Sequence, residues 1–215
     1  VCWGYVLGEF TDATGERSLV ASVRFGLFQV VSIITTTGYG THDFDNWNSL
    51  SKCILFLLMF VGGCAGSTGG GMKVIRWVLV TKILAIEFER AHRPRVVRTL
   101  RLGGKAIDDQ SLRDNILVYF VVIGLIFLLS WLIVVGVEPD TTWSGDQQHK
   151  LIDSASAVAA TLNNIGPGLG TVGATQNYGH FSPPSKVLFT ILMMLGRVEV
   201  FAILVLLMPS FWRSR

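Results

Sequence analysis

Charged side chains are scarce in this chain of 215 residues. Asp, Glu, Lys and Arg make up 15% of it, whereas a soluble globular domain usually carries about a quarter. Half of the residues are hydrophobic, and the mean hydropathy is positive at +0.51. These figures argue against a soluble enzyme, a disordered tail and a fibrous protein, and they favour a membrane protein.

Cysteine is also rare, and the side chains typical of catalysis are not grouped. The three cysteines, Cys2, Cys53 and Cys64, form no disulfide framework. The sequence offers no credible Ser–His–Asp or Cys–His arrangement, and its four histidines show no metal-ligand spacing. We therefore expect neither an enzyme nor a bound organic cofactor.

One long apolar run is present. Ile116–Val137 holds 22 residues without a charge, and at about 1.5 Å per residue such a helix can span the hydrocarbon core. Ten of the 18 Lys and Arg lie between Lys73 and Arg113. Because this cluster connects two apolar spans, a cytoplasmic loop is favoured over a nucleic-acid patch. The acidic connection Glu138–Lys150 is then expected outside.

Two segments of the chain share one layout: a short apolar stretch, a glycine-rich loop, a polar connector and a long apolar run. In the first copy these parts are Leu19–Ile34, Thr35–Gly40, Thr41–Lys52 and the run from Cys53. In the second copy they are Leu151–Leu162, Asn163–Gly170, Thr171–Lys186 and Val187–Met208. The short stretches cannot span a bilayer, so each is expected to be a re-entrant half-helix. Non-helical backbone is tolerated at membrane depth only where it is buried in protein or lines a water-filled cavity.

The predicted fold is therefore an all-α membrane protein built from helix–re-entrant pore helix–helix repeats, as in potassium channels. Residues 1–112 form a repeat with an incomplete leading helix, and residues 113–215 form a complete one. Two loops cannot enclose an ion, and a symmetric filter needs about four. Either the chain pairs with itself or two of an expected four repeats are missing. The incomplete repeat indicates a part of a longer protein.

The loop Thr35–Gly40 closely resembles the potassium-channel filter sequence, in which carbonyl oxygens replace the water shell of the ion. Glycine permits the backbone angles that let consecutive carbonyls face one axis. The predicted potassium ligands are the carbonyls of Thr36, Thr37 and Gly38 and of their equivalents Asn164, Ile165 and Gly166, flanked by Thr35, Tyr39, Gly40, Asn163, Pro167 and Gly168. The competing interpretation is a glycine-rich turn between helices, which the presence of two matching copies disfavours.

A second glycine-rich segment, Gly62–Lys73, interrupts the apolar run that starts at Cys53. Each glycine costs about 1 kcal/mol relative to alanine in a helix, so the segment should break the helix at membrane depth and is a candidate gate. The predicted gate residues are Gly62, Gly63, Gly66, Ser67, Thr68, Gly69, Gly70, Gly71 and Lys73, together with Arg197. A phosphate-binding loop is disfavoured because Lys73 is not followed by Ser or Thr.

Arg197 lies halfway along the apolar run Val187–Met208, where a charge costs at least about 2.5–3.5 kcal/mol. It should face water or a partner such as a carbonyl of the glycine-rich break. We favour a pore-facing arginine that regulates cation passage over a purely structural tie between two helices. Acids of the outer connectors, such as Asp45, are expected to be solvated, and Trp47 and Trp143 to lie in the interfacial aromatic belt.

Taken together, these features resemble the C-terminal half of pore subunits of the Trk/Ktr/HKT potassium-transporter superfamily, most closely the bacterial TrkH-like subunits. The matching stretches are Phe28–Gly40, Gly62–Arg76, Ala155–Gly170 and Leu195–Trp212. The resemblance implies a multi-pass protein of the cytoplasmic (inner) membrane with four repeats around one pore, of which this chain holds an incomplete third and the fourth. It implies that the filter carbonyls named above bind potassium, that Gly62–Lys73 is the gating loop, and that Arg197 is the arginine below the filter.

The same resemblance implies the partners. They are membrane lipid, the missing N-terminal repeats, a second copy in a homodimer, and a cytosolic ring of nucleotide-binding regulatory subunits of the TrkA/KtrA type, with no nucleic acid. The leading hypothesis is potassium uptake through a carbonyl-lined filter gated by the glycine-rich loop. A sodium-conducting or ion-coupled transporter of the same fold, and a membrane sensor without transport, remain as alternatives.

Overall fold

The structure is a computed structural model, and it describes residues 19–93, 100–102, 105–107, 110–143, 147–198 and 212. Within these ranges the regular secondary structure is helical apart from one small hairpin. The helices are α2 (Leu19–Ile34), α3 (Ser49–Leu58), α4 (Val74–His92), α5 (Gln110–Val137), α6 (Gln147–Leu162) and α7 (Pro183–Arg197), with 3₁₀ turns at η1 (Phe44–Asn46), η2 (Asp140–Trp143), η3 (Gly170–Val172) and η4 (Tyr178–His180).

The two half-helices predicted from the sequence are present and equally long. Helix α2 has the predicted bounds Leu19–Ile34, whereas α6 begins four residues before the predicted Leu151 and ends at Leu162 as expected. Each contains 16 residues. At about 1.5 Å per residue, neither is long enough to cross the hydrocarbon core.

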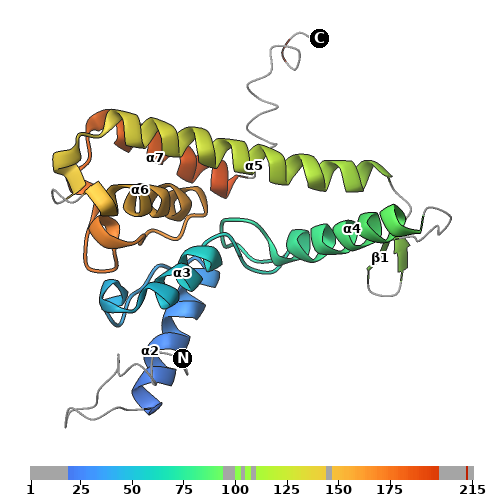
Figure 1. Cartoon of the computed structure of the whole chain (residues 1–215), viewed down its shortest axis with the longest axis horizontal. Coiled ribbons are helices and arrows are strands. Elements are labelled where there is room, and N and C mark those ends of the chain that lie inside the picture. The colour runs from blue at the N-terminus through green and yellow to red at the C-terminus, as the bar shows by residue number, and fades with distance from the viewer. Residues whose placement is uncertain are drawn as a thin grey trace.

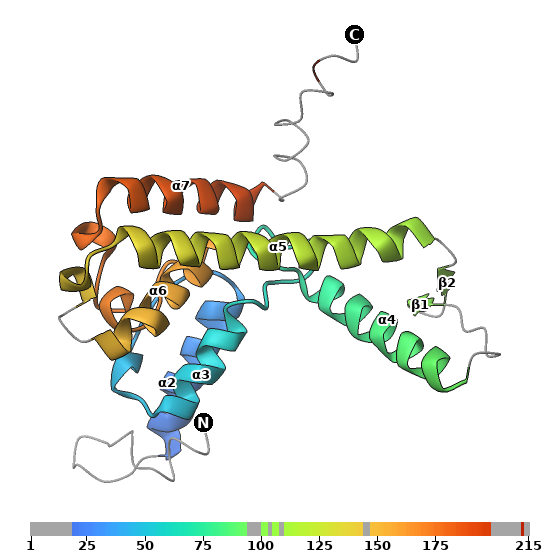
Figure 2. The ribbon, with the colours of Figure 1, turned by 45° about the horizontal axis from the view of Figure 1, so that its top comes forward.

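Helix α6 lies between α5 and α7 on one side and α2 and α3 on the other (Figures 1 and 2). Every residue from Asp153 to Asn163 is buried, and most of these residues are Ala, Ser or Thr. Small side chains let neighbouring helices approach closely, and a helix buried on all sides carries no exposed polar face. The sequence of α6 thus explains its central position.

Helix α5 is the long apolar span, and Arg113–Val137 is long and apolar enough to cross a membrane. It passes over α6 at one end and contacts α4 at the other (Figure 2). Several of its large apolar side chains remain exposed, including Leu129 and Leu132 at 59% and 64%. Such side chains suit contact with lipid, because lipid tails are as apolar as leucine.

The chain leaves helix three residues before the first glycine of the glycine-rich segment, Gly62. Helix α3 ends at Leu58, and α4 resumes at Val74. Part of the basic connection is therefore helical rather than a loop, and a two-stranded antiparallel hairpin, β1 (Leu100–Leu102) and β2 (Lys105–Ile107), follows it. The all-α prediction holds for the fold as a whole, and this hairpin is its one departure among the described residues.

Two sequence expectations are corrected here. Helix α7 ends at Arg197, with Val198 as its C-cap, so Arg197 closes a helix instead of lying in the middle of one; residues 199–211 lie outside the described ranges. Trp47 and Trp143 are buried at 7% and 1% exposure instead of lying in an interfacial belt. Trp143 stacks edge-on against Phe181, with ring centroids 5.3 Å apart.

Candidate functional site

The backbone leaves α2 through a tight turn. The amide of Thr36 donates to Ile33 O at 3.0 Å, and the amide of Thr37 reaches back five residues to Ser32 O at 3.0 Å. Such bonds satisfy the last carbonyls of a helix when the chain turns sharply away from the axis. The residue at the turn, Thr36, has φ +56°.

The chain leaves α6 through the same turn. Asn164 N donates to Thr161 O at 3.2 Å, and Ile165 N reaches back five residues to Ala160 O at 2.8 Å. Asn164 also has φ +56°. The backbone hydrogen bonds of the two loops therefore correspond residue by residue, although the side chains at the turn differ.

In both loops, the residue two positions after this turn residue also has a positive φ. Gly38 has φ +72° and Gly166 has φ +104°, whereas Thr37 and Ile165 between them do not have positive φ. A β-branched residue such as Thr36 is rarely found at positive φ, and a strained backbone of this kind persists only where the surroundings hold it. A backbone in which the sign of φ alternates differs from an ordinary strand, and it can turn successive carbonyls toward one side.

The two loops lie directly against each other. A Cβ atom added to Gly38 would overlap Ile165 O and would stand 3.0 Å from Pro167 Cδ. One added to Gly40 would stand 3.0 Å from Ala174 Cβ. Glycine at position 38 is therefore required twice, by its positive φ and by the close approach of a carbonyl from the other loop.

Hydroxyl groups donate to carbonyls of both loops. Ser32 Oγ donates to Tyr39 O at 2.7 Å, and Thr35 Oγ1 and Thr37 Oγ1 lie 3.3 Å apart. In the second loop, the Tyr178 hydroxyl donates to Gly166 O at 2.7 Å. Burial raises the pKa of Tyr178 above its usual range, so this hydroxyl keeps its proton and remains a donor.

The glycine-rich segment predicted as a gate lies against both loops. Gly70 N donates to Thr36 Oγ1 at 3.2 Å, and a Cβ at Gly70 would stand 2.6 Å from Asn164 Cβ. A Cβ at Gly71 would stand 3.0 Å from Asn163 Oδ1. The structure thus brings together the three glycine-rich stretches that the sequence singled out.

The base of this segment is closed like a hairpin. Gly62 N donates to Met72 O at 2.8 Å, and Val74 N donates to Gly63 O at 3.1 Å. Its tip is held by Lys73, whose Nζ donates to Ser67 O and to Gly69 O, each at 2.7 Å. By contrast, the structure places nothing within 4 Å of a Cβ at Gly66.

Arg197 reaches the same segment from α7. Its Nη1 donates to Thr68 O at 2.5 Å. Nearby, Asn164 Nδ2 donates to Met193 O at 3.0 Å, and a Cβ at Gly196 would overlap Leu162 O. Arg197, Lys73 and Asn163 share the lining of a cavity of about 220 Å³. Helix α7 therefore contacts both the second loop and the glycine-rich segment.

Two acids support the second loop, and the sequence did not reveal them. Asp45 Oδ1 accepts from Gly170 N at 2.7 Å, and Asp153 Oδ2 accepts from Thr171 N at 2.9 Å. Asp45 is thus a half-buried support and not a solvated loop acid, and its partial burial raises its pKa. Asp45 and Gly170 are 125 positions apart, so no local pattern could have indicated this contact.

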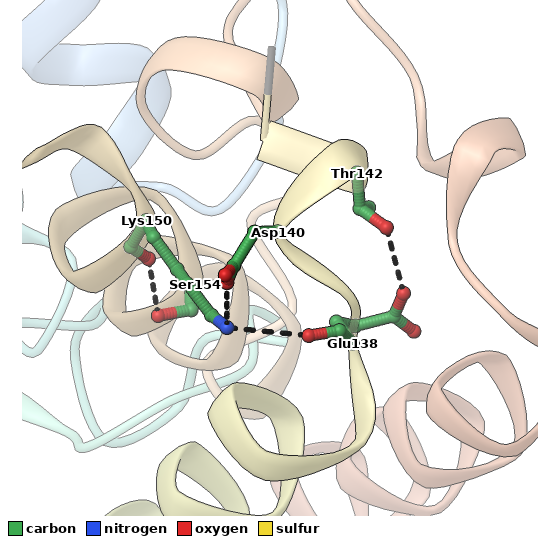
Figure 3. Close-up of polar contacts among 5 residues, drawn as sticks. All are labelled: Glu138, Asp140, Thr142, Lys150 and Ser154. Carbon is green, nitrogen blue, oxygen red and sulfur yellow. Dashed lines mark hydrogen bonds and ion pairs between the residues drawn. The ribbon is translucent and has the colours of Figure 1, made fainter. Parts of the chain in front are cut away.

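A third acid, Glu138, joins the C-terminal end of α5 to the N-terminal end of α7. Its carboxylate accepts from Ser182 N at 3.0 Å, from Ser182 Oγ at 2.5 Å and from Thr142 Oγ1 at 3.2 Å. Lys150 lies between Asp140 Oδ1, at 2.6 Å, and Glu138 O, at 3.3 Å (Figure 3). Burial acts to raise the pKa of Glu138, but the hydrogen bonds outweigh it and the pKa is lowered.

Comparison with known proteins identifies this arrangement. The model of the TrkH family, described as a cation transport protein, matches residues 12–214. The chain belongs to the TrkH family. It is 42% identical over 188 residues to the Trk system potassium uptake protein TrkH of Vibrio parahaemolyticus, 37% over 203 residues to TrkH of Halomonas elongata and 30% over 200 residues to TrkG of Escherichia coli. These matches cover 87%, 94% and 93% of this chain.

A solved structure agrees in fold. The crystal structure of the potassium transporter TrkH from Vibrio parahaemolyticus superposes with a TM-score of 0.80 at 39% identity, covering 92% of this chain and 40% of that one. The chain spans 36–39% of the length of the curated relatives named above. TrkH membership places it in the inner membrane as part of a multi-pass protein.

Proposed function

We propose that this chain forms part of a potassium-uptake pore, in which Thr36, Thr37 and Gly38 and the equivalent Asn164, Ile165 and Gly166 lend backbone carbonyls to a dehydrated potassium ion. The observation that carries the proposal is the contact of Gly38 with Ile165 O between two loops of matching backbone geometry. Relatives named as potassium uptake proteins support the choice of ion.

Exposed apolar faces support the proposal that further repeats complete the ring. Helix α2 buries Ser22, Gln29 and Ser32 but leaves Val20 and Leu27 exposed at 78% and 56%. Its counterpart α6 is buried along its inner length. We assign residues 1–112 to the third repeat and 113–215 to the fourth, so the apolar face of α2 would pack against another repeat.

The glycine-rich segment is proposed as the gate below the filter. It touches both loops, its stretch from Cys64 to Thr68 is exposed, and Lys73 and Arg197 donate to the carbonyls of Ser67, Thr68 and Gly69. Segments with few buried apolar contacts open at low free-energy cost. A fixed positive charge at Arg197 would also oppose the passage of a cation, so release of Arg197 from Thr68 would both free the segment and change the local field.

The partners are proposed from the names of the relatives. A homodimer and a cytosolic nucleotide-binding regulatory subunit are consistent with the words "Trk system" in the relatives' names. The basic helix α4 and the hairpin that follows it would face the cytosol, since positively charged segments stay on that side. Potassium is cargo in this proposal, and no organic cofactor is assigned to the chain.

The test measures rubidium uptake by the full-length protein in liposomes. Gly38→Val and Gly166→Ala place side chains at positive φ, and at position 38 also against a carbonyl, so both should reduce uptake at least about tenfold. Gly136→Ala is the matched control, because a Cβ there meets nothing within 4 Å. Uptake unchanged in the first two variants would contradict the proposal.

Competition separates the alternatives. If the site selects potassium, excess potassium should suppress rubidium uptake more strongly than excess sodium does. Equal suppression by both ions would favour a sodium-conducting transporter of the same fold. Uptake no greater than in empty liposomes, from a correctly folded protein, would favour a membrane sensor.

A further inference from the structure

A large cavity lies outside the filter and gate. It has a volume of about 1060 Å³ and lies between α3, α5 and α6, at the upper end of the size range of ligand pockets. Four residues of α3 at helical spacing line it: Ser49, Lys52, Cys53 and Phe56. Positions i, i+3, i+4 and i+7 form one face of a helix, so this face of α3 is turned toward the cavity and not toward a protein neighbour.

One end of the cavity is apolar and is lined by Phe56 and Phe127. If α4 faces the cytosol as proposed, α3 runs inward from Ser49 and α5 runs outward to Val137, which places this end deeper in the membrane. Phe60, whose ring centroid lies 5.6 Å from that of Phe56 and 5.3 Å from that of Phe127, joins the two helices there. Exposed Leu151 and Ile152 add apolar lining on α6, directly before Asp153.

The outer end of the same cavity is polar and charged. Asp45, Asp153 and Lys52 line it and interact electrostatically with one another. Lys52 Nζ donates to Asp45 O at 3.2 Å. Trp143 also lines the cavity; it is 1% exposed and its Nε1 has no hydrogen-bond acceptor in the described structure. A buried N–H group normally donates to an acceptor, so the unpaired Nε1 of Trp143 indicates that its acceptor lies outside the described residues.

We propose that this cavity binds one phospholipid of the outer leaflet with a primary ammonium headgroup, of the phosphatidylethanolamine class. The cavity has an apolar end at Phe56 and Phe127 and a charged group at Asp45, Lys52 and Asp153, as a lipid has an apolar part and a charged headgroup. Two carboxylates suit the ammonium group, and Lys52 suits the phosphate. Trp143 Nε1 would donate to a phosphate or ester oxygen. Because Asp45 and Asp153 also hold Gly170 and Thr171, the lipid would support the outer end of the second loop.

The first experiment is native mass spectrometry of the full-length protein with phosphatidylethanolamine, phosphatidylcholine or phosphatidylglycerol of identical chains. Phosphatidylethanolamine should bind about tenfold more tightly than the other two, which is about 1.4 kcal/mol. Asp153→Asn keeps an acceptor for Thr171 N but removes the charge, so it should abolish this preference. Equal binding of the three lipids to the unmodified protein would overturn the headgroup assignment.

A cavity-filling pair locates the site. Cys53→Trp fills the cavity and should lower the affinity for phosphatidylethanolamine about tenfold or more, whereas Ile54→Trp, on the adjacent exposed position outside the cavity, should not. Lipid binding that is the same in the two variants would place the lipid elsewhere and overturn the proposal.

Thiol labelling keeps the test decisive if Cys53→Trp fails to fold. In the unmodified protein, a lipid-soluble maleimide should label Cys53, and added phosphatidylethanolamine should slow that labelling severalfold. Cys64, which is exposed and does not line the cavity, is the internal reference and should be unaffected. If Cys53 is unreactive with and without lipid, another part of the full-length protein fills the cavity and the proposal is wrong.

Discussion

At the scale of single residues, the contact between Arg197 and Thr68 O is the most consequential one that the structure adds. A charged arginine that donates to a carbonyl restrains the segment that carries the carbonyl. The sequence indicated a partner of this kind, because a charge on an apolar helix needs water or an acceptor. The particular carbonyl could not be predicted, since it depends on how α7 and the glycine-rich segment meet.

We predict that Arg197→Ala increases cation uptake severalfold, because it removes both a positive charge and a restraint on the glycine-rich segment. Arg197→Lys retains the charge but loses the guanidinium donor geometry, so it should give an intermediate rate. The measurement is the initial rate of rubidium uptake by the full-length protein. A rate unchanged in Arg197→Ala would favour the purely structural role.

Asp45→Asn should slightly stabilise the protein at neutral pH. The pKa of Asp45 is raised in the folded state, so the folded state binds its proton more readily and stability falls as pH rises through that pKa. Asn keeps an acceptor for Gly170 N without that cost. Thermal unfolding in detergent should show a gain at pH 7 that disappears at a pH below the normal aspartate pKa, about 3.9. A loss of stability at pH 7 would show that the charge itself is needed.

At the scale of elements, α7 is positioned by its closest approach to the end of α6. A Cβ at Gly196 would overlap Leu162 O and stand 2.6 Å from Asn164 Nδ2. We predict that Gly196→Ala displaces α7 and lowers both thermal stability and uptake, at a cost of about 1–3 kcal/mol. Gly124→Ala, where a Cβ meets nothing within 4 Å, is the matched control and should be neutral or slightly stabilising.

Glu138 joins the C-terminal end of α5 to the N-terminal end of α7. Glu138→Ala would leave Ser182 N and the Thr142 hydroxyl without their acceptor, at a cost of about 1–3 kcal/mol. Since the pKa of Glu138 is lowered on folding, its contribution is present above the unfolded pKa of about 4.3 and is lost as pH falls through the folded value. A stability difference between the two proteins that does not shrink in acid would contradict this account.

The elements were predicted more accurately than their contacts. Helix α2 matched Leu19–Ile34 at both ends because a glycine-rich loop and an apolar stretch define it locally. Helix α6 began earlier than expected because its first turn, from Gln147, is polar and carries no hydrophobic period. The hairpin at Leu100–Leu102 was missed because strands of three residues leave too short a pattern. Asp45, Asp153 and Glu138 act on distant segments, which no local signal reports.

At the scale of the whole molecule, the two loops and the glycine-rich segment converge on one region although they lie in three separate stretches of the chain. Family membership and the agreement with a TrkH crystal structure confirm the predicted fold class. The roles of the filter and gate residues stay predictions. Their convergence is what the proposed pore requires, because carbonyls must come from several loops to surround one ion.

The most direct test locates the ion itself. The full-length protein would be crystallised in the presence of rubidium ions, and anomalous scattering would be measured at the X-ray absorption edge of rubidium. We expect an anomalous peak bordered by the carbonyls of residues 36–38 and 164–166, weakened by excess potassium but not by equal sodium. A well-ordered structure with no peak between these two loops, or with rubidium bound only elsewhere, would contradict the proposed filter.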